Sequence, residues 1–96
     1  LLLQCLYKSG KCEFKKGNLD NAFDYYLSAV YHFFDNLVLK TSSNVMWFTR
    51  SAFAAAELQE NLGNLKGAIA IYERVVNAEV NSSDEANRRI EILKKL

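Results

Sequence analysis

The chain has 96 residues, of which 50% are hydrophobic and 24% charged, and 12 basic against 11 acidic side chains leave a net charge of +1. This length and balance are typical of one small globular domain or part of a longer protein. They exclude a disordered tail, a collagen-like chain and a disulfide-dense mini-protein.

The sequence is expected to form helices throughout. Proline is absent, and a strand-and-turn protein of this size uses several prolines in its turns. Gly17 and Gly63 mark two tight helix ends, because glycine adopts the left-handed conformation there at low cost. Polar runs at 41–44 and 81–84 separate the remaining helices. The predicted helices cover about residues 1–16, 19–40, 45–61, 65–80 and 85–96.

Two stretches of the sequence match at an offset of 46 residues. Each has a glycine, an asparagine and a leucine, followed by a small residue and then by an aromatic residue one turn later. We expect the small residues Ala22 and Ala68 to let paired helices approach closely, and Tyr26 and Tyr72 to fill the space between them. The matching residues are Gly17, Asn18, Leu19, Ala22, Tyr26 and Val30 in the first stretch and Gly63, Asn64, Leu65, Ala68, Tyr72 and Val76 in the second.

These residues resemble the tetratricopeptide repeat family, whose helix-turn-helix unit has five small or aromatic signature positions. The resemblance implies an all-α, right-handed stack of helical hairpins with no catalytic activity. Its units would be a hairpin at 1–40, a hairpin at 45–80 and a capping helix at 83–96, at the C-terminal end of a longer array. The family's usual proline is absent from both units. The signature positions are held by Gly10, Gly17, Ala22, Tyr26 and Ala29, and again by Ala56, Gly63, Ala68, Tyr72 and Val75.

The offset of 46 residues exceeds the family period of ~34 by about 12 residues. No glycine or proline marks an inserted loop, so we expect the second helix to be longer at its end and the third helix at its start. Two paired helices bury only one stripe of side chains each, and this region has more large apolar residues than two such stripes can hold. They either pack on neighbouring repeats or form a docking surface for a partner or a second copy. The expected docking surface consists of Phe34, Val38, Met46 and Trp47.

The resemblance also implies a concave groove, lined by the first helix of each unit, in which a peptide or helix lies. Three of its lysines recur at i, i+3 and i+7 beside aromatic residues, which suits an acidic or amphipathic peptide. The alternative is a solvated basic face. The lysine–asparagine set that holds a C-terminal carboxylate in some relatives is not reproduced. Carried over from the family, the groove-facing positions are Gln4, Tyr7, Lys8, Lys11, Phe14 and Lys15 of the first unit and Arg50, Phe53, Ala54, Glu57, Glu60 and Asn61 of the second. The groove residues expected to bind the ligand are Tyr7, Lys8, Lys11, Phe14, Lys15, Arg50, Phe53 and Glu57.

No catalytic, metal or cofactor site is predicted. Cys5 and Cys12, on one helix, would lie ~10.5 Å apart, beyond the ~7 Å limit for a disulfide, and no CxxC pair occurs. His32 lies among aromatic residues, and no glycine-rich phosphate loop is present. We also expect no nucleic-acid binding, because the lysines near the N-terminus form the only basic cluster. No apolar run reaches the ~18 residues of a membrane span.

The sequence leaves the compartment open. The chain does not begin with methionine, so we expect a processed or excised segment. Residues 83–96 resemble the tails of bacterial cell-envelope tetratricopeptide proteins, which favours the envelope or periplasm, whereas unbridged cysteines favour the cytoplasm. The predicted function is a non-catalytic protein–protein interaction scaffold that binds a peptide or helix in the groove. The alternative is a self-assembly module that uses the extended aromatic hairpin.

Overall fold

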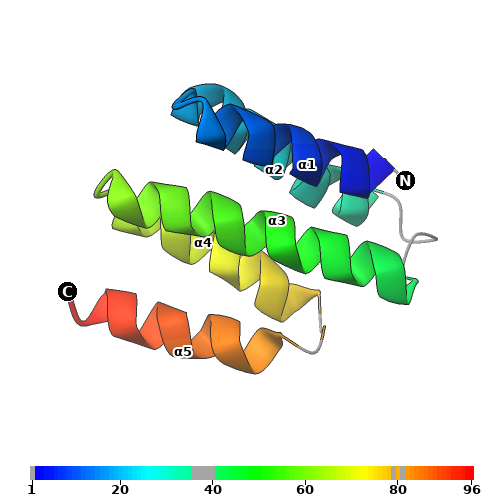
Figure 1. The fold of residues 1–96 in the computed structure, drawn as a ribbon. Helices are drawn as coiled ribbons and strands as arrows, with labels where there is room; N and C mark the ends of the chain where they lie inside the picture. Colours follow the sequence, from blue (N-terminus) through cyan, green and yellow to red (C-terminus); the bar gives the residue numbers. More distant parts are fainter. Residues whose placement is uncertain (1, 36–40, 79, 81) are drawn as a thin grey trace.

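The computed structural model describes residues 2–35, 41–78, 80 and 82–96, and within them all regular structure is helical. This confirms the predicted all-α fold of helical hairpins. The helices, shown in Figure 1, are α1 (Leu2–Lys15), α2 (Leu19–Asp35), α3 (Ser42–Asn61), α4 (Leu65–Asn77) and α5 (Ser83–Lys94).

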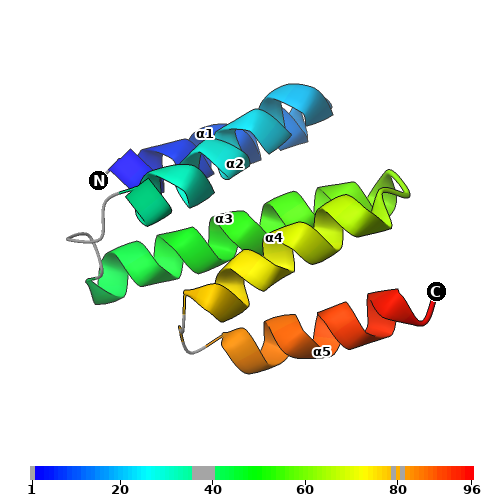
Figure 2. The ribbon, with the colours of Figure 1, turned by 180° about the vertical axis from the view of Figure 1, so that it is seen from behind.

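The helices form two layers. Helices α1 and α2 make one hairpin and α3 and α4 the next, and the two hairpins stack with α1 and α3 in one layer and α2 and α4 in the other (Figures 1 and 2). The guanidinium of Arg74 on α4 lies 4.6 Å from the ring centre of Tyr31 on α2. Helix α5 packs against α4 and closes the C-terminal end of the stack. Because α2 also packs against α3, the second helix of one hairpin contacts the first helix of the next.

Several helix boundaries differ from the prediction by one to three residues. Helix α3 begins at Ser42, not at residue 45, because the hydroxyl of Thr41 accepts a hydrogen bond from the backbone N–H of Asn44 at 3.2 Å and caps the helix. Helix α4 ends at Asn77, three residues before its predicted end near residue 80, and α5 begins at Ser83, two residues before its predicted start. The predicted end of the second helix, at 36–40, lies outside the described residues.

The turns within the two hairpins are built alike. Gly17 and Gly63 have φ of 84° and 81°, as their predicted place at helix ends requires. In each turn an asparagine side chain bonds back to the preceding helix. The Asn18 amide donates to Glu13 at 2.8 Å, and the Asn64 amide donates to Gln59 at 2.7 Å.

Small residues bring the paired helices close together, as the internal repeat predicts. Ala22 and Ala68 are fully buried, and Tyr26 and Tyr72 are buried beside them. A Cβ atom placed on Gly10 would lie 2.6 Å from the Tyr26 ring, so α1 and α2 approach more closely there than any other residue would allow.

Part of the aromatic surplus between the two repeats is internal core. Phe33 of α2 and Phe48 of α3 are both buried, and their rings stack at 4.3 Å with an interplanar angle of 17°. The half-buried Phe34 packs edge-on against both rings, at 6.1 and 5.5 Å. These three side chains join the two hairpins at the end where the chain passes from one to the other.

Candidate functional site

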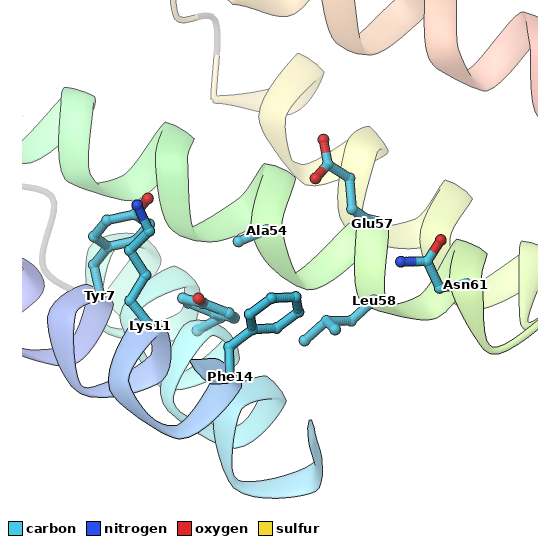
Figure 3. A pocket seen from close by; sticks show the side chains of 8 residues that line it. Tyr7, Lys11, Phe14, Ala54, Glu57, Leu58 and Asn61 are labelled. Carbon is cyan, nitrogen blue, oxygen red and sulfur yellow. The ribbon is translucent and has the colours of Figure 1, made fainter. Parts of the chain in front are cut away.

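An open hollow of about 210 Å³ lies between α1 and α3 (Figure 3). Phe14 on α1 and Leu58 on α3 point toward one another across it, and Tyr26 reaches it from α2. The hollow is lined by Tyr7, Lys11, Phe14, Tyr26, Ala54, Glu57, Leu58 and Asn61.

Aromatic rings make the α1 side of the hollow. Tyr7 packs against Tyr26 at 5.7 Å and against Trp47 of α3 at 5.6 Å, so its ring is fixed from two helices. The Lys11 ammonium lies 5.9 Å from the centre of the Tyr7 ring, which attracts the cation electrostatically. Phe14 is 47% exposed, which leaves part of its side chain available to a ligand.

Tyr26 connects the hollow to the core. Burial raises its pKa to about 12, with a smaller contribution from Tyr7. The phenol therefore stays neutral at physiological pH, and the back of the hollow carries no charge. Lys11 and Glu57, on α1 and α3, supply its charged groups.

Four of the eight predicted groove residues line this hollow, namely Tyr7, Lys11, Phe14 and Glu57. Lys8 and Lys15 are exposed on α1 outside it. Arg50 lies over the ring of Trp47 at 5.1 Å, and Phe53 packs edge-on against Tyr72 at 5.5 Å.

Tyr26 and Leu58 line the hollow but were not among the predicted groove residues. Leu58 lies four residues after Ala54 and three before Asn61, and this helical spacing could have indicated it. The pattern around Tyr26 indicated a core residue only.

Beside the hollow, Arg89 of α5 pairs with carboxylates of α3 and of its own helix. Its Nη1 atom lies 3.5 Å from Glu57 and 4.0 Å from Glu60 of α3, and its Nε atom lies 3.3 Å from Glu85. The same Nη1 donates to the Tyr72 hydroxyl at 3.3 Å, and that hydroxyl donates to Glu60 at 2.6 Å. We call these five residues the Arg89 cluster. Burial, followed by the hydrogen bond to Glu60, holds the pKa of Tyr72 well above its usual value.

The two sides of the site carry opposite charge. Helix α1 presents Lys8, Lys11 and Lys15, whereas α3 presents Glu57 and Glu60. Because Arg89 already pairs with both carboxylates, the lysines of α1 and the exposed Arg50 of α3 are the charged groups with capacity for a ligand. The arrangement suits an anionic group on the α1 side of an apolar hollow.

The residues of the expected docking surface do not share one environment. Trp47 is half-buried against Tyr7, whereas Phe34 packs on the other aromatic pair and has the Arg74 guanidinium 5.6 Å from its ring. Met46 is 39% exposed. Val38 lies outside the described residues.

Among the described residues, no group of three or more His, Cys, Asp or Glu side chains could hold a metal ion. Nor does the described part of the chain include a helix that is long and apolar enough to cross a membrane. Cys5 and Cys12 are free and exposed, and His32 is half-buried.

Comparison with known proteins identifies the repeats. A model of the tetratricopeptide repeat family matches the chain twice, at residues 4–33 and 50–82. The first match covers nearly all of α1 and most of α2, and the second runs from the ninth residue of α3 through α4. The two matches start 46 residues apart, so the extra length falls between them. No curated protein and no solved structure matches the chain. Since the two matches cover more than half of its residues, the chain belongs to the tetratricopeptide repeat family.

Proposed function

We propose that this chain is a non-catalytic interaction module that binds an acidic peptide or helix in the groove between α1 and α3. Tetratricopeptide repeats generally mediate protein–protein interaction, which supports the class of function. The observation that carries the proposal is the aromatic hollow, which has lysines on one side only.

The hollow suits one large apolar side chain of a ligand. Its walls are the rings of Tyr7 and Phe14 and the side chain of Leu58. Burying one aromatic side chain there is worth ~1.5–3 kcal/mol before the cost of association. An anchor of this kind, surrounded by weaker contacts, is typical of peptide-binding interfaces.

The lysines of α1 suit carboxylates that flank the anchor. Lys8, Lys11 and Lys15 lie on successive turns of one helix, so a ligand lying along α1 can contact more than one of them. Exposed ion pairs add only ~0.2–1 kcal/mol each. Their main contribution is orientation of the ligand and a faster, salt-dependent association.

The proposed absence of catalysis follows from the chemistry of the hollow. Its charged groups are Lys11 and Glu57, and Glu57 is paired with Arg89. The neutral phenol of Tyr26 has a pKa of about 12, too high for a general base near neutral pH. The geometry therefore supports recognition rather than proton transfer.

The test uses three fluorescein-labelled peptides of equal length and fluorescence anisotropy. The first is rich in Glu with one central Phe, the second has Ser in place of the Phe, and the third has Lys in place of each Glu. We expect the first to bind most tightly and loss of the Phe to weaken binding roughly tenfold or more. Equal affinity for the first two would overturn the anchor, and tighter binding of the third would overturn the acidic preference.

A variant of the protein separates packing from charge. Ala54→Lys places in the hollow the residue that the first repeat has at the equivalent position, Lys8, so the helix tolerates it. We expect it to weaken binding of the acidic Phe peptide despite its added positive charge, because the side chain occupies the hollow. Lys66→Glu, exposed on α4, is the control and should leave the affinity unchanged. Stronger binding by Ala54→Lys would show that charge alone attracts the peptide.

Self-association through the extended hairpin is the second candidate function. It is favoured by the exposed side chain of Met46, in the first turns of α3 and close in sequence to the aromatic core. Sedimentation velocity at micromolar to millimolar concentration tests it. Met46→Glu is the sharper variant, since Phe34→Glu would also disturb the core. A dimer that Met46→Glu dissociates without unfolding would support this function, and a monomer throughout would exclude it.

A further inference from the structure

Two positively charged side chains lie over adjoining aromatic rings where α1 and α3 meet. The Lys11 ammonium of α1 is 5.9 Å from the centre of the Tyr7 ring, and the Arg50 guanidinium of α3 is 5.1 Å from that of Trp47. The two rings contact each other, with their centres 5.6 Å apart. These four side chains therefore share one aromatic surface, and we call them the Lys11–Arg50 site.

The two cations approach this aromatic surface from the same end. Helices α1 and α3 run in the same direction (Figure 1). Lys11 follows Tyr7 by four residues and Arg50 follows Trp47 by three, so each cation begins about one turn beyond the ring that it covers. Both cations are exposed. A single ligand group placed between α1 and α3 can therefore reach both of them.

The second repeat shows how a cation in an equivalent place is neutralised within the protein. At the offset of 46 residues, Tyr7 corresponds to Phe53, and the Arg89 guanidinium lies 5.7 Å from the centre of the Phe53 ring. Arg89 pairs with three carboxylates. One of them, Glu57, occupies the position that Lys11 has in the first repeat. In the second repeat, acidic side chains thus balance the cation over the ring.

The Lys11–Arg50 site has no such balance. None of the carboxylates whose side chains the structure describes pairs with Lys11 or Arg50. Glu57, the acidic residue of the adjoining hollow, lies 3.5 Å from Arg89. Two neighbouring like charges repel each other, and an anion placed between them removes this repulsion. The site is therefore complementary to a ligand group with more than one negative charge.

We propose that the Lys11–Arg50 site binds the phosphate of a phosphorylated side chain that lies beside the apolar anchor of the ligand. This inference rests on the proposed groove function and names the acidic group that the groove selects. A phosphorylated residue carries about −1.5 to −2 charges near neutral pH and has three acceptor oxygens, whereas a glutamate carries a single charge. Arginine binds phosphate oxygens with two parallel hydrogen bonds. Because Lys11 also lines the hollow, the phosphate would lie next to the anchor.

Fluorescence anisotropy with peptides that differ at one residue tests the proposal. The parent is the acidic peptide with one central Phe, and a series of peptides replaces, one at a time, each Glu that flanks the Phe by phosphoserine. We expect at least one phosphopeptide to bind roughly tenfold more tightly than the parent, because its phosphate makes charge-assisted hydrogen bonds to both cations. Alkaline phosphatase converts that peptide into its matched control, a Ser peptide, which should bind more weakly than the parent.

Protein variants assign the effect to the site. Arg50→Gln and Lys11→Gln each remove the charge of an exposed side chain, so the fold should be retained, which circular dichroism checks. Each should reduce the preference for phosphoserine over Glu to about twofold or less. Arg50→Lys keeps the charge but loses the paired hydrogen bonds, and it should retain part of the preference. Lys66→Gln, at an exposed position of α4, is the control and should leave the preference unchanged.

The contrary results separate this proposal from the groove function on which it rests. Phosphopeptides that bind no more tightly than the parent at any position would overturn the proposal and leave the groove function standing. A preference for phosphoserine that persists in both Arg50→Gln and Lys11→Gln would also overturn it, because the phosphate would then lie elsewhere. If none of the peptides binds, the groove function fails together with this proposal.

Discussion

Replacing Gly10 by alanine sets two effects of known size against each other. In the interior of a helix, alanine is favoured over glycine by ~1 kcal/mol. The new Cβ atom, however, would lie 2.6 and 2.7 Å from two carbons of the Tyr26 ring. Tyr26 is buried in a packed core, so its ring cannot move away without displacing its neighbours. Overpacking costs ~1–3 kcal/mol, and we therefore expect Gly10→Ala to lower the free energy of unfolding by about 1 kcal/mol.

Urea unfolding followed by far-ultraviolet circular dichroism measures this change, provided that the m-value stays constant. Gly17→Ala is the contrasting control, because nothing lies within 4 Å of its Cβ position and its cost arises from the positive φ alone. Tyr26→Leu should rescue Gly10→Ala but not Gly17→Ala in a double-mutant cycle. A Gly10→Ala variant as stable as the parent would refute the argument, since the ring would then have room to move.

Three further predictions follow from single side chains. The Ser51 hydroxyl is buried without a hydrogen-bond partner, so Ser51→Ala should raise the free energy of unfolding by ~1 kcal/mol. A lower urea midpoint for Ser51→Ala would contradict this prediction. Arg89→Ala should lower the free energy of unfolding by ~1–2 kcal/mol because it leaves the Arg89 cluster without its cation. The control Arg88→Ala removes one exposed ion pair and should change the free energy of unfolding by less than ~0.5 kcal/mol. The pKa of Tyr26 rises from 10.0 to about 12 on folding, so its contribution to stability is complete below pH 10 and is lost as the pH rises toward 12. Alkaline unfolding of Tyr26→Phe should therefore be shallower than that of the parent, and equal slopes would show that Tyr26 does not titrate on unfolding.

Local signals were sufficient to predict the hairpins. Gly17 and Gly63 have the positive φ that their place before an asparagine indicated. The alternation of small and aromatic residues at Ala22 and Tyr26 placed both in the core. These features act within a few residues, so they can be recognised in the sequence without knowledge of the fold.

Features that depend on distant contacts could not be predicted in the same way. Apolar residues continue past Asn77, and nothing local ends α4 there. In the structure, the Ser83 hydroxyl donates to the carbonyl of Val75 at 3.3 Å and gives the helix end a partner from the next helix. The Arg89 cluster likewise joins residues up to 32 positions apart, Glu57 to Arg89, which no helical spacing connects.

The candidate groove was predicted in part, for a physical reason. A helical stripe identifies which side chains of one helix share a face, and Tyr7, Lys11 and Phe14 of α1 line one hollow. It does not show which side chains of a second layer reach between two helices. Tyr26 therefore appeared as a core residue only, although its ring also forms part of the hollow.

The position of Glu57 has a consequence for how the two ends of the molecule communicate. Its carboxylate belongs to the hollow and at the same time pairs with Arg89 of the terminal helix. A ligand cation that engages Glu57 must compete with Arg89, so its binding and the attachment of α5 share one coupling free energy. Thermodynamic reciprocity then requires that the α5 contact weaken the binding of such a ligand by the same factor by which the bound ligand weakens the α5 contact. Peptides with a basic group at this point would be disfavoured whenever the last helix is in place, and the far end of the stack would help to select ligands by their charge.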